Sequence, residues 1–181
     1  ADLHTSNIMA SRDKMKVIDM EFAFMGPFGY DLGYLVGNLI SQYCAACFKR
    51  FPSEQNRKQF KAYLLATIKS LIETYMKTFT LCWEKSVKER YRGQQGLLQS
   101  ILQEVMEDVP GYASMVNWFR SVSEIPYPDF DIIEDKDAKR NATVLSLMID
   151  WGIMFGRYKY QSADDLIETI IGIEEEFRKS L

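Results

Sequence analysis

Charge of one sign, long apolar runs and paired cysteines are all scarce in this sequence of 181 residues. The 22 basic and 25 acidic residues leave a net charge of −3, which gives no general reason to expect a nucleic acid or an anionic membrane as partner. No uninterrupted apolar run approaches the roughly 18 residues of a membrane-spanning helix. The first residues also lack the basic, apolar and small-residue regions of a signal peptide, so we expect a cytoplasmic protein.

The three cysteines are an odd number, which argues against a disulfide framework. Cys44 and Cys47 form a C-x-x-C sequence, which would suit a redox pair or half of a zinc site. They fall within an expected helix, between Tyr43 and Phe48, and no second pair of ligands follows nearby. We therefore expect two buried structural thiols in a reducing compartment.

Apolar residues make up 47% of the chain, enough for one domain with a substantial core. Two β-like runs, at residues 8–10 and 15–20, flank a polar stretch and predict a β-hairpin. After a break at residues 26–29 the pattern is helical. The sequence therefore predicts a mostly α domain with one small hairpin at its front edge.

Apolar periodicity and capping residues predict the helices that follow. Ser53 and Ser162 are expected N-caps, and Pro110 is expected to begin the second of two short helices. Residues 126–129 are expected to form a linker. The expected helices cover residues 30–48, 53–90, 97–109, 110–122 and 136–158 and a last segment after Ser162.

Several apolar residues of the late helix share one side. These residues are Val144, Leu147, Met148, Trp151 and Phe155. Each of the three tryptophans, Trp83, Trp118 and Trp151, could line a substrate pocket, but we expect them in the helical core.

The first 21 residues hold an unusual density of polar functional groups. Asp2 and Asn7 have the spacing D-x-x-x-x-N, and Asp19 and Glu21 follow an apolar run. If the strand continued through that run, Asp19 and Glu21 would point to the same side and face one ion. One carboxylate that accepts a proton from a hydroxyl, with an Asn and a second Asp on Mg²⁺, is the arrangement that phosphoryl transfer uses.

Two stretches, DLHTSNIM and KVIDMEFAFMGPFGYDLGYLVGNL, resemble the catalytic and metal loops of the 5-methylthioribose kinases. That family lies within the aminoglycoside phosphotransferase and choline kinase superfamily of protein-kinase-like enzymes. The resemblance is dense from Asp2 to about Leu39 and general beyond it. It implies the helical C-terminal (substrate) lobe of that fold, with residues 1–39 carrying the loops and hairpin and residues 40–181 a helical substrate subdomain.

Carried over position by position, the resemblance assigns the catalytic base to Asp2. It makes Asp19 and Glu21 ligands of the metal and of the nucleotide phosphates, and Asn7 a further Mg²⁺ ligand. ATP and Mg²⁺ are the implied cofactors. Singly, such residues are ordinary turn or strand-end residues. Their joint spacing favours the kinase interpretation.

The resemblance also gives supporting roles at the site. Asp31 would brace the loops, and His4 within the catalytic loop is expected to be a hydrogen-bonding brace rather than a proton carrier. Methylthioribose kinases carry an adjacent arginine pair late in the chain that helps to bind the sugar. This sequence has no Arg-Arg, so Arg140, Arg157 and Trp83 are the substrate-contact candidates.

Kinase-like enzymes place a β-rich lobe before the catalytic loop, where it covers the nucleotide. Since this sequence starts one residue before Asp2, we expect that lobe to be absent, as in a truncated or split reading frame or a fragment. The chain alone is then expected to be inactive. Its exposed front edge should self-associate or bind a lobe-like partner.

The expected function is phosphorylation of the 1-hydroxyl of methylthioribose in methionine salvage, with a small sugar as partner. Two alternatives remain open at this point. One is another aminoglycoside or choline kinase-like phosphotransferase, and the other is a non-catalytic helical binding module.

Overall fold

The computed structural model describes residues 2–122 and 128–181, and helices dominate them. The hairpin of β1 (Ile8–Ala10) and β2 (Met15–Val17) is the only sheet within these ranges. The helices are α1 (Tyr30–Phe48), α2 (Glu54–Ser86), α3 (Leu97–Val122), α4 (Pro128–Asp131), α5 (Lys136–Gly156) and α6 (Ala163–Ser180). The mostly α fold predicted from the sequence is confirmed. Among the described residues no helix is both long and apolar enough to cross a membrane.

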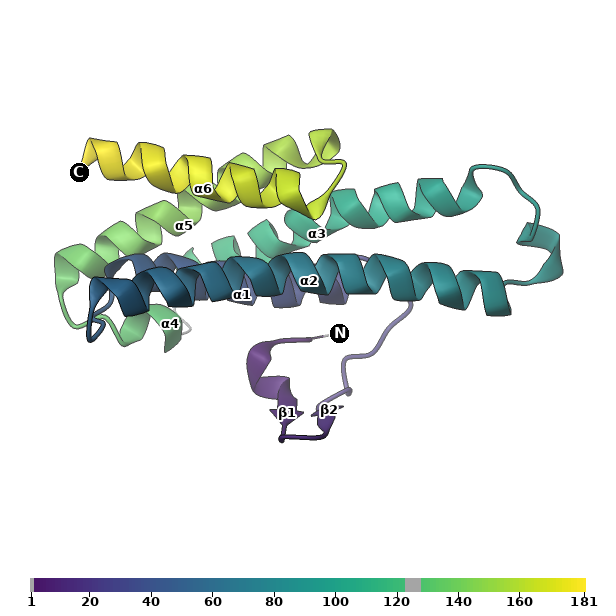
Figure 1. The fold of residues 1–181 in the computed structure, drawn as a ribbon, viewed down its shortest axis with the longest axis horizontal. Helices are drawn as coiled ribbons and strands as arrows, with labels where there is room; N and C mark the ends of the chain where they lie inside the picture. Colours follow the sequence, from purple (N-terminus) through teal and green to yellow (C-terminus); the bar gives the residue numbers. More distant parts are fainter. Residues whose placement is uncertain (1, 123–127) are drawn as a thin grey trace.

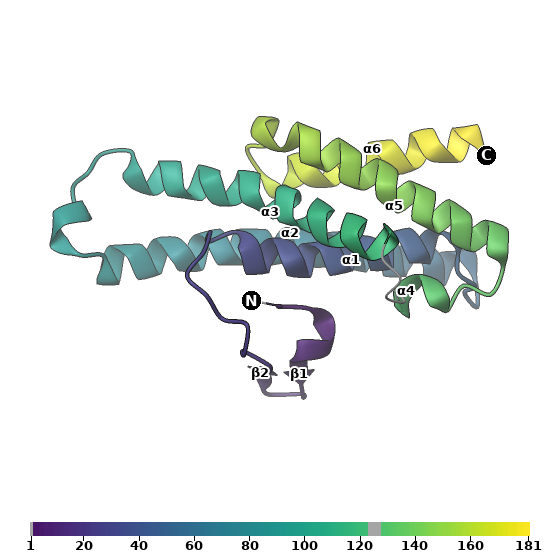
Figure 2. The same ribbon diagram turned by 180° about the vertical axis from the view of Figure 1, so that it is seen from behind.

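The long helices form one bundle, and the hairpin lies apart from it (Figure 1). α2 runs along the length of the molecule, with α5 and α6 on the side opposite the hairpin (Figures 1 and 2). α1 packs against α2, α3 and α5 and is buried along most of its length. The hairpin connects to α1 through an irregular segment with two turns at residues 18–29, which leaves the N-terminal loop beside the bundle.

Three glycines let α1 approach α3 closely. Gly29, Gly33 and Gly37 follow one another at intervals of four residues and so lie on one face of the chain entering and forming α1. A Cβ atom on Gly33 would lie 2.8 Å from the carbonyl oxygen of Val109, and one on Gly37 would lie 2.8 Å from that of Ala113. Only glycine therefore fits at this contact without a shift of the α3 backbone.

Gly37→Val is expected to lower the free energy of unfolding by about 3 kcal/mol or more, because its side chain would push the α3 backbone away. Gly172→Ala on α6 is the matched control, since its Cβ would meet nothing within 4 Å. That change should stabilise the helix by about 0.5–1 kcal/mol. Urea unfolding of both variants checks the difference, and similar midpoints for the two would contradict this packing.

The hairpin is shorter than the sequence predicts. β1 and β2 pair antiparallel, but β2 ends at Val17 instead of continuing through residue 20. Ile18 donates its N–H to the carbonyl of Asn7, 2.9 Å away, and Asp19 adopts the left-handed backbone with φ of 61°. The chain therefore turns away from the strand direction directly after the last ladder pair.

The two short helices predicted around Pro110 are wrong, because α3 continues through that residue. Val105, Val109 and Ala113 are all buried and form one unbroken apolar face toward α1. A helix interior proline removes one backbone hydrogen bond, and we attribute the continuity to the packing of this face. Ser114 also donates its hydroxyl to the carbonyl of Pro110, 2.7 Å away.

Other predicted bounds differ by a few residues. α2 ends at Ser86, before a short 3₁₀ turn at Glu89–Tyr91, and α5 ends at Gly156. Ser53 and Ser162 are N-caps as predicted, and Ser162 forms a capping box with Asp165. In the predicted linker, residues 128 and 129 belong to α4, while residues 126 and 127 lie outside the described residues.

The predicted thiols are buried and free, as expected for Cys44 and Cys47. Burial raises the pKa of the Cys47 thiol to about 12. The core position expected for the tryptophans is wrong, because Trp118 is 62% exposed, Trp151 is 70% exposed and Trp83 is half-buried outside the core. The side of α5 that carries Trp151 faces solvent, and its core side consists of Ala142, Leu145, Ser146, Ile149, Asp150 and Ile153.

Candidate functional site

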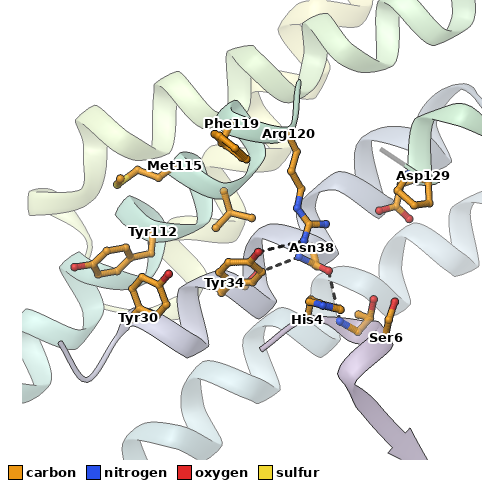
Figure 3. A pocket seen from close by; sticks show the side chains of 13 residues that line it. His4, Ser6, Tyr30, Tyr34, Asn38, Tyr112, Met115, Phe119, Arg120 and Asp129 are labelled. Atoms are coloured by element: carbon orange, nitrogen blue, oxygen red, sulfur yellow. Dashed lines mark hydrogen bonds between the residues drawn. The ribbon is translucent and has the colours of Figure 1, made fainter. Parts of the chain in front are cut away.

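A cavity of about 620 Å³ lies between the N-terminal loop, α1, α3 and α4 (Figure 3). The loop contributes its polar residues, and α1 and α3 contribute mostly aromatic and apolar ones. The lining residues are His4, Thr5, Ser6, Tyr30, Tyr34, Asn38, Tyr112, Met115, Val116, Phe119, Arg120, Pro128 and Asp129. Its volume is that of a typical small-molecule site.

Asp2 and Asn7, the two loop residues of the D-x-x-x-x-N motif, lie in contact. The side-chain amide of Asn7 donates a hydrogen bond to the carbonyl of Asp2, 3.1 Å away. Asn7 itself is buried, and Asp2 has a φ of 71°, a backbone conformation that is costly for a residue with a Cβ. The loop therefore holds Asp2 in a strained but fixed position.

His4 lies next to Asp2 and lines the cavity. Its Nε2 atom is 3.6 Å from Oδ2 of Asp2, and its ring centroid is 6.4 Å from that of Tyr34. The N–H of Thr5 donates to the side-chain oxygen of Asn38 at 3.5 Å, which attaches the loop to α1. The loop is thus docked on the bundle at the mouth of the cavity.

Tyr34 and Arg120 form the polar centre of the cavity wall (Figure 3). Arg120 donates a hydrogen bond from Nη2 to the Tyr34 hydroxyl at 3.3 Å, and its guanidinium lies 5.6 Å from the Tyr34 ring centroid. Burial raises the pKa of Tyr34, Arg120 lowers it, and the Asp2 carboxylate raises it again. The Tyr34 hydroxyl therefore binds Arg120 and lies within the influence of the Asp2 carboxylate.

Asp129 closes the cavity from α4. Burial raises the pKa of its carboxyl group, and the positive charges of Arg120 and Lys49 oppose that rise. The cavity therefore holds one guanidinium and one partly buried carboxyl group among aromatic rings. Such a mixture suits a ligand with both hydroxyl groups and an apolar part.

Asp19 and Glu21 lie on the exposed segment after β2. Because β2 ends at Val17 and Asp19 has a positive φ, the argument that strand spacing aligns them does not apply. Within residues 2–122 and 128–181, no three His, Cys, Asp or Glu side chains form a group that could hold a metal. The oxygen atoms of Asn7, Asp19 and Glu21 do have the donor chemistry that Mg²⁺ prefers, so their metal role remains a prediction.

Asp31 lies in the first turn of α1, where the helix dipole favours a carboxylate. Burial raises the pKa of Tyr75, and the negative charge of Asp31 raises it further. Tyr75 donates its hydroxyl to the carbonyl of Phe28 at 2.7 Å. Asp31 therefore lies near the contact between α2 and the segment before α1, and its bracing role remains a prediction.

The structure does not bring the three predicted substrate contacts to this cavity. Arg140 is exposed and pairs with Asp137 at 3.3 Å near the start of α5. Arg157 packs over the ring of Tyr158. Trp83 stacks on Phe79 near the end of α2.

Sequence reasoning missed Arg120 and Tyr34. Arg120 stands on α3, whereas Arg140 lies on α5 and Arg157 in the short 3₁₀ turn that follows α5. The only signal in the sequence was the general one of a lone arginine among aromatic residues. Packing of α3 on α1 is what brings Arg120 to the N-terminal loop.

Residues 1–71 match the phosphotransferase enzyme family. The chain is 30% identical over 173 residues to the methylthioribose kinase of Geobacillus thermodenitrificans, an alignment that covers 96% of the chain and 41% of that relative. It is 32% identical over 177 residues to methylthioribose kinase 2 of Oryza sativa subsp. japonica, in an alignment that covers 92% of the chain and 41% of that relative. It is 27% identical over 169 residues to the methylthioribose kinase of Yersinia enterocolitica, in an alignment that covers 93% of the chain and 42% of that relative.

The chain thus spans about two fifths of the length of these curated relatives. The similarity extends over nine tenths of the chain, well beyond the loops that suggested it. The resemblance to the methylthioribose kinases predicted from the sequence is therefore confirmed.

Proposed function

We propose that this chain, as a relative of the methylthioribose kinases, forms the acceptor-binding part of an ATP-dependent kinase that phosphorylates methylthioribose. The observation that carries the proposal is the position of the Asp2–Asn7 loop beside a cavity that contains Tyr34 and Arg120. A phosphotransferase needs a carboxylate next to an acceptor site, and this loop supplies one. We further propose a cytoplasmic location, since buried free thiols such as Cys44 suit a reducing compartment.

In this mechanism Asp2 accepts the proton of the 1-hydroxyl as it attacks the terminal phosphate of ATP. Arg120 and the Tyr34 hydroxyl orient the sugar by hydrogen bonds. Asn7, Asp19 and Glu21 would hold Mg²⁺, which when bound neutralises charge on the phosphate oxygens. Met115 and Phe119 line the apolar part of the cavity and suit a methylthio group.

Two alternatives are less well supported. A cationic aminoglycoside or choline-like substrate would meet the guanidinium of Arg120 within the cavity. A non-catalytic helical module would have no use for the strained backbone of Asp2 or its hydrogen bond from Asn7. The neutral sugar is therefore the proposed acceptor.

Asp2→Asn tests the proposal in a fusion of this chain with the remaining segment of the Geobacillus thermodenitrificans relative. We expect ADP formation that depends on methylthioribose and falls about 10²- to 10⁴-fold in the variant, as for loss of a general base. Arg120→Lys should instead raise KM. Asp13→Asn, on the exposed hairpin turn, is the control with unchanged rates.

The proposal fails if Asp2→Asn retains full activity, or if choline or an aminoglycoside replaces methylthioribose as acceptor. The 181 residues alone are expected to form no ADP that depends on methylthioribose. Robust turnover by them would contradict that expectation.

We also propose that the front edge of the molecule is covered by a lobe-like partner or a second copy. Phe22 is 58% exposed and Phe24 is 56% exposed, and Met25 is fully exposed beside them. Apolar patches of this kind seldom stay bare. The edges of the hairpin also offer backbone groups to another chain.

Sedimentation at micromolar concentration is expected to show self-association of the chain, and Phe22→Asp should abolish it. Tyr63→Asp is the matched control, because Tyr63 is a 63% exposed aromatic residue on α2. A monomer at every concentration would rule out the second copy. Equal effects of the two variants would place the contact elsewhere.

A further inference from the structure

Helices α3 and α5 run side by side (Figure 2). A second hollow lies between them, lined by residues of both. This groove has a volume of about 440 Å³ and shares only Met115 with the lining of the first cavity. Trp118 of α3 stands on one wall, and Trp151 and Phe155 of α5 stand on the other. The rings of Trp151 and Phe155 have centroids 4.4 Å apart, so they form one continuous aromatic wall.

These aromatic side chains are unusually exposed. Trp118, Trp151 and Phe155 are 62%, 70% and 64% exposed. Scattered exposed apolar residues need no explanation, but a cluster that surrounds a concave site indicates binding. The kinase function proposed above makes no use of this cluster.

Asp150 lies at the bottom of the groove and is only 4% exposed. Its two oxygens accept hydrogen bonds from uncharged groups, Asn117 Nδ2 at 3.1 Å and Ser146 Oγ at 3.4 Å. Burial raises the pKa of the carboxyl group to about 8, while Asn117 and Ser146 lower it. The floor of an apolar groove is thus a carboxyl group held by neutral donors.

Asn117 in turn accepts a hydrogen bond from Ser41 of α1 at 2.7 Å. A buried polar chain of this kind fixes the orientation of the carboxyl group. The titratable group that faces Asp150 from α1 is the Cys44 thiol, whose pKa is raised by burial and by nearby negative charge. Cys44 therefore stays a neutral thiol and adds no negative charge beside Asp150.

We propose that this groove is a binding site for a small apolar or aromatic molecule that bears one primary ammonium group. The rings of Trp118, Trp151 and Phe155 would enclose the apolar body, and the ammonium would donate to Asp150. A cation near aromatic faces is stabilised by the ring quadrupoles. The same cation favours the ionised carboxylate, which supplies the charge pairing that the free groove lacks.

A second copy of the chain is the competing occupant. A dry apolar interface would bring no new hydrogen-bond donor to the Asp150 carboxyl group, which is already only 4% exposed. An ammonium instead makes use of that carboxyl group. The concave shape and the single polar group at its floor therefore favour a small ligand.

Calorimetry with 2-phenylethylamine and its neutral analogue 2-phenylethanol tests the proposal on the chain itself. We expect the amine to bind at least tenfold more tightly at pH 7, and Asp150→Asn to remove this preference. Trp151→Leu should weaken both ligands. Trp83→Leu is the matched control, because Trp83 stacks on Phe79 of α2 outside the groove.

Proton release gives an independent readout of Asp150. Since the free carboxyl group is protonated at pH 7, binding of the ammonium should release a proton. The binding heat is then expected to differ between phosphate and Tris buffers for the wild type but not for Asp150→Asn. A structural role alone would not produce this difference.

Three results would overturn the proposal. The first is equal affinity for the amine and the alcohol, and the second is no amine binding at millimolar concentration. The third is sedimentation showing a dimer that Trp151→Leu dissociates, which would assign the groove to a second copy. Neither of the first two depends on phosphotransfer, so the proposed kinase activity stands or falls separately.

Discussion

Glu174→Gln is expected to lower the free energy of unfolding by about 3 kcal/mol, because it breaks a buried ion cluster. Glu174 of α6 is buried and accepts hydrogen bonds from Tyr43 of α1 and Lys61 of α2. Arg178 donates to the same carboxylate from Nε at 2.6 Å. One carboxylate therefore joins three helices, and its loss leaves the partly buried Lys61 ammonium without its closest partner.

The charge of Glu174 also makes the fold sensitive to acid. Burial alone would raise the pKa of Glu174, but the hydrogen bonds from Lys61, Tyr43 and Arg178 outweigh it and lower the pKa to about 2. A depressed pKa in the folded state stabilises the fold above the unfolded value of about 4.5. That stabilisation is lost as the pH falls from about 4.5 toward 2.

Urea unfolding of Glu174→Gln at pH 6 and pH 3 measures both effects. Its deficit relative to the wild type should be largest at pH 6 and should shrink at pH 3. Glu175→Gln, on the neighbouring exposed position, is the control and should behave like the wild type. A deficit as small as that of the control would show that the cluster adds nothing.

Local signals predicted the parts of the fold that depend on few residues. The N-caps Ser53 and Ser162 mark the starts of α2 and α6, since a cap needs only the next turn of the helix. The helix break predicted at Pro110 was wrong because the prediction considered only the local loss of a helix hydrogen bond at proline. The compensating packing on Gly33 lies more than 70 residues away in the sequence. Tertiary contacts of this kind are absent from a propensity argument.

In the candidate site, too, the sequence indicated what lies within one loop but not the contacts between distant helices. Asp2 and Asn7 lie within one loop, and the motif spacing had assigned both of them to one site. Tyr34 and Arg120 meet across two helices, and no local pattern pairs them. The alignment of Asp19 with Glu21 was argued from strand geometry, which ends at Val17. Their role thus rests on the family resemblance and not on the strand.

The exposed tryptophans show a different limit of prediction from sequence, which concerns the burial of single side chains. A tryptophan in a helical segment is more often buried than not, so the core was the reasonable expectation for Trp118 and Trp151. The buried face of α5 instead carries the polar residues Ser146 and Asp150. The helix therefore places a carboxyl group inward and an indole outward, against the usual pattern. Such an inversion is typical of a functional surface.

Asp150→Asn is expected to remove a strong pH dependence from the stability of the fold. The folded pKa of Asp150 is about 8, against 3.8 for an unperturbed Asp, because the charged form is buried. Between these pH values the folded state keeps a proton that the unfolded state has lost. Stability therefore falls as the pH rises, by about 1.4 kcal/mol per unit for this group alone.

From pH 5 to pH 8 this contribution amounts to about 4 kcal/mol, which is an upper estimate since local relaxation reduces the cost of a buried charge. An asparagine is nearly isosteric with the protonated carboxyl group, can keep the contacts with Asn117 and Ser146, and cannot ionise. Urea unfolding at pH 5 and pH 8 should show the variant close to the wild type at pH 5 and more stable at pH 8. Asp13→Asn, on the exposed turn of the hairpin, should follow the wild type at both values. If Asp150→Asn keeps the full pH dependence of the wild type, Asp150 is already ionised in the folded chain. The groove then contains a negative charge before any ligand binds.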